Sequence, residues 1–339
     1  MKEPFGTLPN GQQTTLYTIS CGRLSAAVSD FGATLVRLLV PDDQGNTADV
    51  VLGYDDANGY LNNDGFLGAI VGRNANRIKG ATFPLNGKQI KLSPLENQFG
   101  NNLHSGPDYF HTRMWQVEHY EESSITFRLD SPDGDQGFRG NATIRVTYSL
   151  DNNDTLHVVY TGICDKDTVF NMTNHCYFNL AGHDKPEAAM DQVLTLPARF
   201  FTAADEESIP TGELRSVEGS PMDFRVPKPI GRDINEDYDA LNLQAGYDHN
   251  FEVFTDPCAI LTDPVSGRTM AVSTNLPGVH FYSGNYLDLT GKGGIHYGKR
   301  SGVALETQYY PNSVNHPEWA QPFVKAGVRY RSETKYRFK

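Results

Sequence analysis

The chain has 339 residues and a formal charge of -12 at neutral pH, and its basic residues do not gather into a run. This excess of negative charge repels phosphate backbones and anionic lipid, which excludes nucleic acid and membrane surfaces as expected partners. The four cysteines form no CxxC pair and are too few for a disulfide framework in a chain of this length, so we expect reduced thiols.

Strand-forming residues recur in short runs along the chain, and turn residues separate the runs. The clearest runs cover residues 16–19, 33–40, 125–129, 142–150 and 156–160. The dipeptides Asn10-Gly11 and Asn86-Gly87 tolerate the backbone conformations of tight hairpin turns. Only residues 55–62 and 317–320 have room for a helical turn or two. These patterns predict an all-β fold.

No low-complexity linker or repeat divides the chain, and Gly and Pro are spread evenly along it. We therefore expect one domain that covers residues 1–339. The N-terminus has neither the basic start nor the apolar run of a secretory signal, and no stretch approaches about 18 apolar residues. We expect a cytoplasmic protein.

Residues 169–180 alternate between unlike side chains, which predicts a strand with two different faces. One face carries Phe170, Met172, Cys176, Phe178 and Leu180, interrupted only by Asn174, and the other carries Asn171, Thr173, His175, Tyr177 and Asn179. The apolar face is typical of a core, so Cys176 should be buried and inert. The polar face, with His175 in its middle, is either an ordinary surface or a row of groups that binds a polyhydroxylated ligand.

Residues 302–309 alternate as well, which places Glu306 on one face with Ala304 and Gln308. This pattern leaves two interpretations of Glu306 open. It is a solvated strand residue, which is the commonest fate of a glutamate, or a partly desolvated base with room for a ligand above Ala304.

Three clusters of residues combine charged side chains with turn residues, at 72–78, 101–106 and 246–251. Each mixes donors and acceptors that suit sugar hydroxyls, although any one of them alone is more typical of turn chemistry or a surface ion pair. The chain has no HExxH, no GxxxxGK[ST] and no GxSxG motif. No metal, nucleotide or other cofactor is therefore expected.

These segments together resemble the galactose mutarotase (aldose 1-epimerase) family, from near residue 15 to the C-terminus. The matching segments, in the family's order, are residues 72–78, 102–104, 174–180, 209–212, 221–225, 247–251 and 305–308. The resemblance implies a single large antiparallel β-sandwich, which agrees with the all-β pattern. It also implies an enzyme that interconverts the α and β anomers of free hexoses such as galactose and glucose.

The resemblance assigns a role to each matching residue. His175 is the implied general acid and Glu306 the implied general base, and the implied sugar-binding residues are Asn76, Arg77, His104, Tyr177 and Asp248. Opening a pyranose needs a proton delivered to the ring oxygen and another removed from the anomeric hydroxyl, which suits this pair. We expect the carboxylate of Glu306 to be ready to accept a proton, and His175, near anionic groups, to favour its charged form.

The chain departs from the family's pattern at two places. His280 stands where the family usually has glutamine; it can still hydrogen-bond the sugar, but it also titrates. Residues 105–113 differ from the family's more usual glycine-rich stretch, which leaves the preferred sugar open. Two alternatives remain: a glycoside hydrolase that uses Glu306 and Asp248 as a carboxylate pair, and a catalytically silent sugar-binding protein.

Overall fold

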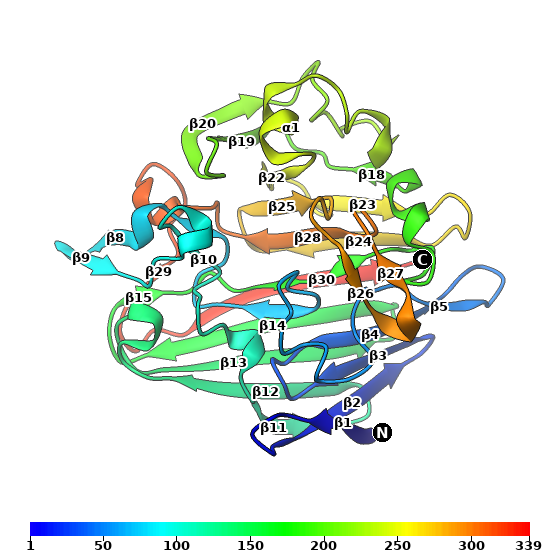
Figure 1. The fold of residues 1–339 in the computed structure, drawn as a ribbon, viewed down its shortest axis with the longest axis horizontal. Helices are drawn as coiled ribbons and strands as arrows, with labels where there is room; N and C mark the ends of the chain where they lie inside the picture. The colour runs from blue at the N-terminus through cyan, green and yellow to red at the C-terminus, as the bar shows by residue number, and fades with distance from the viewer.

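The computed structural model describes residues 1–339, and its longest strands lie in a nine-stranded antiparallel sheet (Figure 1). In spatial order the strands are β11 (Gln116–Tyr120), β12 (Ser124–Ser131), β13 (Ala142–Asp151), β14 (Thr155–Cys164), β30 (Tyr330–Phe338), β24 (Thr269–Thr274), β23 (Ala259–Thr262), β18 (Val193–Thr195) and β21 (Lys228–Pro229). Burial along β13 alternates strictly, with Ile144, Val146 and Tyr148 inside and their neighbours partly exposed. One face of this sheet therefore packs on the core and the other faces solvent.

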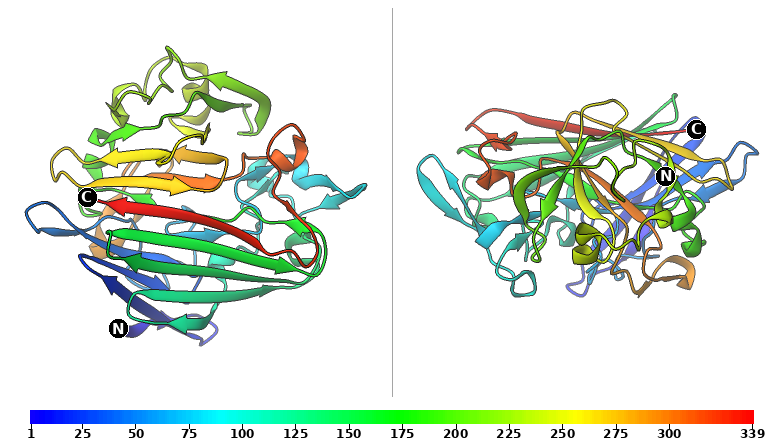
Figure 2. Two further views of the ribbon diagram at one scale, coloured as in Figure 1. Left: turned by 180° about the vertical axis from the view of Figure 1, so that it is seen from behind. Right: turned by 90° about the horizontal axis from the view of Figure 1, so that it is seen from above.

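Two further sheets lie against the nine-stranded sheet (Figure 2). The six-stranded sheet has the order β17 (Tyr177–Phe178), β28 (Val303–Gln308), β25 (Gly278–Tyr282), β22 (Asp248–Glu252), β19 (Phe200–Ala204) and β20 (Pro210–Ser216). The five-stranded sheet runs from β1 (Lys2–Thr7) through β2 (Gln13–Cys21), β3 (Leu24–Ser29) and β4 (Leu35–Pro41) to β5 (Thr47–Asp49). One cluster of 55 buried residues draws on all three sheets. The rings of Phe178 and Tyr336, for example, pack across the layers with centroids 5.0 Å apart.

Five two-stranded pairs complete the strands: β7 (Arg77–Ile78) with β10 (Asn102–Leu103), β6 (Ala69–Val71) with β16 (Thr173–His175), β8 (Thr82–Leu85) with β9 (Lys88–Lys91), β15 (Thr168–Val169) with β29 (Phe323–Val324), and β26 (Leu289–Thr290) with β27 (His296–Tyr297). The predicted hairpin at Asn86-Gly87 joins β8 to β9, with φ values of 52° and 71°. The prediction of an all-β antiparallel sandwich is confirmed.

The only α-helix is α1 (Asp239–Gln244), which is too short for its periodicity to be recognised in the sequence. Eight 3₁₀ turns accompany it: η1 (Lys79–Ala81), η2 (Glu96–Gln98), η3 (Phe110–Thr112), η4 (Asp135–Gly137), η5 (Pro186–Asp191), η6 (Ile230–Arg232), η7 (Lys292–Gly294) and η8 (Ser313–Asn315). The prediction of helical turns at 55–62 and 317–320 is wrong, because both segments form non-helical turns. None of the helices is both long and apolar enough to span a bilayer.

Residues 169–180 do not form the single strand that the sequence predicts. They divide into β15, β16 and β17, which pair with three different partners. The apolar face is buried as expected, and Cys176 lies in it as a free thiol. Asn174, which interrupts that face, donates from its amide to the hydroxyls of Tyr160 and Tyr336, each at 3.0 Å. The polar face is also buried, so it is not an ordinary surface.

Candidate active site

All eight residues that the sequence marks as site residues line one cavity of about 760 Å³. They are Asn76, Arg77, His104, His175, Tyr177, Asp248, His280 and Glu306. The cavity lies where β16, β22, β25 and β28 meet the loops that carry residues 61–66 and 97–112. Its size is within the range of small-molecule sites.

Glu306 reaches the cavity because of the register of β28. It lies opposite His280 of β25, and its neighbours Leu305 and Thr307 point to the other face, into the core. Only 2% of Glu306 is exposed. This resolves the two interpretations left open by the sequence, since Glu306 is a desolvated carboxyl group rather than a solvated strand residue.

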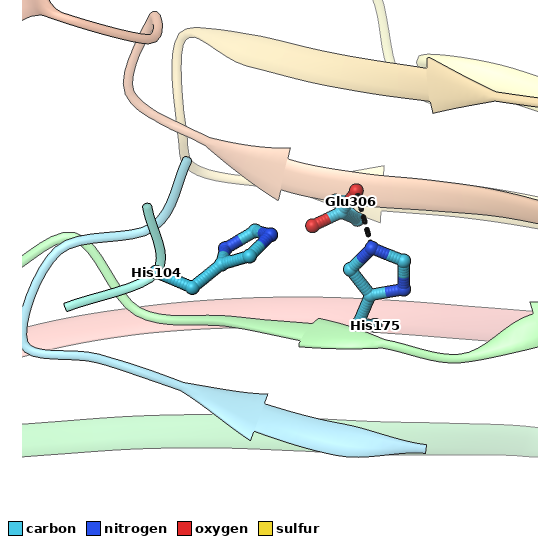
Figure 3. Close-up of side chains that lie close together, drawn as sticks. All are labelled: His104, His175 and Glu306. Atoms are coloured by element: carbon cyan, nitrogen blue, oxygen red, sulfur yellow. Dashed lines mark ion pairs between the residues drawn. The ribbon is translucent and has the colours of Figure 1, made fainter. Parts of the chain in front are cut away.

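His175 faces Glu306 from the neighbouring strand β16, which pairs with β6 (Figure 3). Its Nε2 atom lies 3.6 Å from Oε1 of Glu306. This separation is longer than a direct N–H···O hydrogen bond, which is about 2.7 to 3.2 Å. The two groups are thus close enough to affect each other's charge, but they do not form a direct hydrogen bond, so both can bind a ligand.

Burial controls the ionisation of this pair. It lowers the pKa of His175 to about 4 and raises the pKa of Glu306 well above its ordinary value, and Asp248 adds to the rise at Glu306. The expectation that His175 favours its charged form is therefore wrong, because the loss of hydration outweighs the attraction of nearby anions. A neutral His175 with a protonated Glu306 still holds the same number of protons as a charged His175 with an ionised Glu306.

His104 is held by two contacts with Asn76. The backbone N–H of Asn76 donates to Nδ1 of His104 at 3.1 Å, and the backbone N–H of His104 donates to the carbonyl of Asn76 at 3.1 Å. Burial, reinforced by His175 and Arg77, lowers the pKa of His104. Because the ring is neutral and Nδ1 accepts a hydrogen bond, the proton resides on Nε2. His104 therefore presents an N–H donor to the cavity.

The ligand atoms of His104, His175 and Glu306 lie within 4.8 Å of one another, a spacing that also suits a metal ion (Figure 3). A neutral histidine binds a metal through its unprotonated nitrogen, while the other nitrogen donates a hydrogen bond. His104 has the reverse arrangement. Its Nδ1 atom accepts a hydrogen bond, so the nitrogen that faces the cavity, Nε2, carries the proton. Its chemistry fits an oxygen acceptor, such as a hydroxyl, better than it fits a metal ion.

Asp248 and His280 form a second pair beside the first. Nε2 of His280 lies 2.6 Å from Oδ1 of Asp248. Burial alone would raise the pKa of Asp248, but the hydrogen bond from His280 and the charges of His280 and Arg77 outweigh it and lower that pKa below its ordinary value. Asp248 is consequently an ionised acceptor at neutral pH.

Arg77 and Tyr177 complete the predicted set. Arg77 is partly exposed and donates from Nε to Oε1 of Gln98 at 3.2 Å, which holds its guanidinium at the cavity wall. Asn76 precedes it with a φ of 60°, a conformation that asparagine tolerates. The buried Tyr177 packs on His175 with ring centroids 5.0 Å apart.

The sequence pattern missed several residues that line the same cavity. Phe66 lies in the middle of an aromatic group, with ring centroids 4.8 Å from His104, 5.1 Å from Tyr109 and 5.1 Å from His111. Nothing in the alternation or motifs around Phe66 marks it. Tyr282 does carry a signal, since it lies two residues from His280 and so shares its face.

Comparison with known proteins identifies the family. The sequence profile of the aldose 1-epimerase family matches residues 15–337. The chain is 39% identical to a galactose mutarotase of Bos taurus, covering 98% of this chain and 97% of the relative. It is 41% identical to an aldose 1-epimerase of Haemophilus influenzae, covering 91% of each. The solved structure of a GalM/aldose epimerase homologue from C. elegans superposes with a TM-score of 0.88 at 30% identity, covering 96% of this chain and 98% of that one.

Proposed function

We propose that this chain, which belongs to the aldose 1-epimerase family, interconverts the α and β anomers of a free aldose through proton transfers by His175 and Glu306. The observation that supports these roles most strongly is the separation of 3.6 Å between Nε2 of His175 and Oε1 of Glu306 inside one cavity. An acid and a base at this spacing can serve the ring oxygen and the anomeric hydroxyl of one sugar. Galactose is a proposed substrate because several of the relatives are named galactose mutarotase, and glucose is a second because others are named aldose 1-epimerase and glucose is an aldose.

In the ring-opening step, charged His175 donates its Nε2 proton to the ring oxygen while ionised Glu306 removes the proton of the anomeric hydroxyl. The bond between the anomeric carbon and the ring oxygen breaks, and a carbonyl forms. After rotation about the bond between the first two carbons, the same two proton transfers run backwards on the opposite face of the carbonyl. The enzyme returns to its starting state.

The burial of His175 and Glu306 favours the open-chain state in the middle of this reaction. Ring opening leaves His175 neutral and Glu306 protonated, and burial stabilises this arrangement by lowering the pKa of His175 and raising that of Glu306. The dry site therefore lowers the free energy of the open-chain aldehyde state relative to the cyclic one. Sugar hydroxyls that accept a hydrogen bond from charged His175 and donate one to ionised Glu306 offset the charge separation that must precede opening.

The remaining predicted residues orient the sugar. The Nε2–H of His104 and the guanidinium of Arg77 are donors, and the ionised Asp248 is an acceptor, so together they suit hydroxyl groups around the ring. Asn76, Tyr177 and His280 line the same cavity beside them. No cofactor takes part in this scheme. The free thiols support a reducing compartment, so we place the enzyme in the cytoplasm.

Polarimetry on freshly dissolved α-galactose and α-glucose tests the activity, with aryl glycosides in parallel. We expect fast equilibration of the anomers without cleavage of the glycosides. Cleavage would support the glycoside hydrolase alternative, and sugar binding without any acceleration would support the silent binding protein. Either result would overturn the proposed function.

A further inference from the structure

A group of buried polar side chains lies next to Glu306 but does not line the cavity. We call it the inner polar cluster, and it consists of Asn171, Thr173, Asn250 and Gln308. The exposed fraction of each is 1% or less. None of them lines the cavity, whereas Glu306 does.

Sheet register places this cluster against Glu306. Asn250, His280 and Glu306 form one row across β22, β25 and β28. Gln308 lies two residues beyond Glu306 on the same face, opposite Gly278. A Cβ atom at Gly278 would lie 2.4 Å from Oδ1 of Asn250, so the absence of a side chain there lets the Asn250 amide lie over β25 toward Gln308.

The third side of the cluster comes from β16 and the residues just before it, which lie beside β28. Oδ1 of Asn171 accepts the backbone N–H of Tyr309 at 2.8 Å, which fixes the Asn171 amide next to Gln308. Thr173 shares the face of His175 by the period of the strand. The cluster is therefore bordered by β16, β22, β25 and β28 and by Glu306.

Apart from Oδ1 of Asn171, the side-chain polar atoms of this cluster have no hydrogen-bond partners within the protein, and neither has one oxygen of Glu306 beside it. These atoms are Nδ2 of Asn171, Oγ1 of Thr173, both amide atoms of Asn250 and of Gln308, and Oε2 of Glu306. Buried amides without any partner are strongly unfavourable, so native proteins pair them with protein or with ordered water. A buried water needs two to four polar partners, and this cluster supplies them. Because none of the four cluster residues lines the cavity, an occupant of the cluster would be water rather than sugar.

We propose that the inner polar cluster holds internal water that donates a hydrogen bond to Oε2 of Glu306 and keeps Oε1 directed at His175 and the sugar. Asn250 and Gln308 are thus positioning residues that act on Glu306 through water. The inference rests on the proposed role of Glu306 as the base. It adds a second consequence, because a hydrogen bond to Oε2 stabilises the ionised form of Glu306 that removes the anomeric proton.

The effect on pH dependence follows from the number of protons that His175 and Glu306 hold in each state. Losing the water bond destabilises both states that contain ionised Glu306, but leaves the two states with protonated Glu306 unchanged. The alkaline limb of the kcat profile, where the pair loses its last proton, therefore moves to higher pH, and the acid limb stays in place. The plateau falls as well, because the reactive arrangement with ionised Glu306 becomes rarer.

Other groups that face Glu306 have to be considered in such a profile. On the cavity side they are Arg77, His104, His175, Tyr177, Asp248 and His280. On the core side are Cys176 and Tyr336, whose pKa values burial raises, so neither changes charge between about pH 5 and 9. None of these groups is altered by a substitution at Gln308.

The test compares Gln308→Met with a matched control, Gln192→Met. Gln192 is also fully buried, but its amide is satisfied by the protein: Nε2 donates to Asn179 at 2.7 Å and Oε1 accepts the N–H of Leu180 at 3.2 Å. For Gln308→Met we expect a kcat about tenfold lower, an alkaline limb shifted up by about one pH unit, and little change in KM. For Gln192→Met we expect a lower Tm with both limbs unchanged.

Two results would overturn the inference. One is a Gln308→Met profile that superimposes on the wild type while Glu306→Gln is inactive, which rejects the water but keeps the base. The other is a high-resolution crystal structure of the wild type in which the amides bond directly to each other or to Glu306 with no water between them. Near wild-type activity of Glu306→Gln would instead reject the proposed role of Glu306, whatever the crystal shows.

Discussion

The nine-stranded and six-stranded sheets bury their residues in different ways. In β13 and β14 the inward positions are apolar and the outward positions are partly exposed, so each strand has one dry and one wet face. In β28 of the six-stranded sheet every residue from Val303 to Gln308 is buried, and the same holds for β16, which lies beside β28 but pairs with β6. One face of these strands meets the core, through Leu305 of β28 and Asn174 of β16, and the other carries Glu306 and His175.

This difference separates the residues that stabilise the fold from those that form the site. The nine-stranded sheet places apolar groups where they are favourable and polar groups where water reaches them. The site strands hold polar groups away from water, which shifts their pKa values and leaves several of their atoms without protein partners. Substitutions in the two regions should consequently change different measurements.

The largest effect is expected for Glu306→Gln, which keeps the shape of the side chain but removes the proposed base. Turnover in polarimetry should fall by about two orders of magnitude or more, while sugar binding largely survives. His175→Asn should behave likewise. The exposed Glu213→Gln is the matched control and should be silent. Near wild-type mutarotation by Glu306→Gln would make Glu306 a structural strand residue.

Arg77→Lys should have the next largest effect. Lysine keeps the charge but loses the planar fork and the Nε donor to Gln98. We expect KM to rise about tenfold with a much smaller change in kcat, because the proton transfers themselves remain. A variant with unchanged KM would remove Arg77 from the proposed sugar-binding residues.

Ile144→Val tests the other region of the comparison. Ile144 is fully buried in β13, and the loss of one methylene should lower the free energy of unfolding by about 1 kcal/mol. Urea denaturation measures this change, and kcat and KM of the folded enzyme should stay as in the wild type. A change in kcat would mean that the two regions are not energetically separate.

The smallest effect is expected for His280→Gln. Glutamine can still donate to Asp248, so activity should remain within about threefold of the wild type. The wild-type kcat/KM should fall below about pH 4, because His175 is then protonated while Glu306 is protonated too. It should also fall at alkaline pH, where His175 and Glu306 lose the one proton that they share. Glutamine lacks the charge by which His280 helps to lower the pKa of Asp248, so that pKa should rise in the variant and the shape of its profile should change. Superimposable profiles would place His280 outside the catalytic electrostatics.

The sequence predicts the sandwich well because its long strands repeat one simple pattern. Period two is visible in residues 142–150 and 156–160, and the structure has β13 and β14 there. The family resemblance also named eight residues that line one cavity. The division of 169–180 into three short strands was not predictable, because separate pairing with β6, β28 and β29 is decided by residues far along the chain.

The charge of His175 was mispredicted for a related reason. Sequence shows which ionisable groups are present, but the balance between attraction and desolvation depends on how deeply they are buried. His104 shows the same dependence, since its tautomer follows from a contact with Asn76, 28 residues away. Phe66 carries no signal at all, because an isolated aromatic in a turn looks the same whether or not it borders a cavity.

The register between β25 and β28 also determines where this protein tolerates insertions during evolution. The connection at 283–302 between the two strands can lengthen or shorten while Glu306 stays opposite His280. A single residue inserted between Val303 and Glu306 would reverse the faces of the strand beyond it. Glu306 would then turn toward the apolar core, and a hydrophobic neighbour would take its place in the cavity. Homologues should accordingly vary in length at 283–302 and stay constant in length across 303–308.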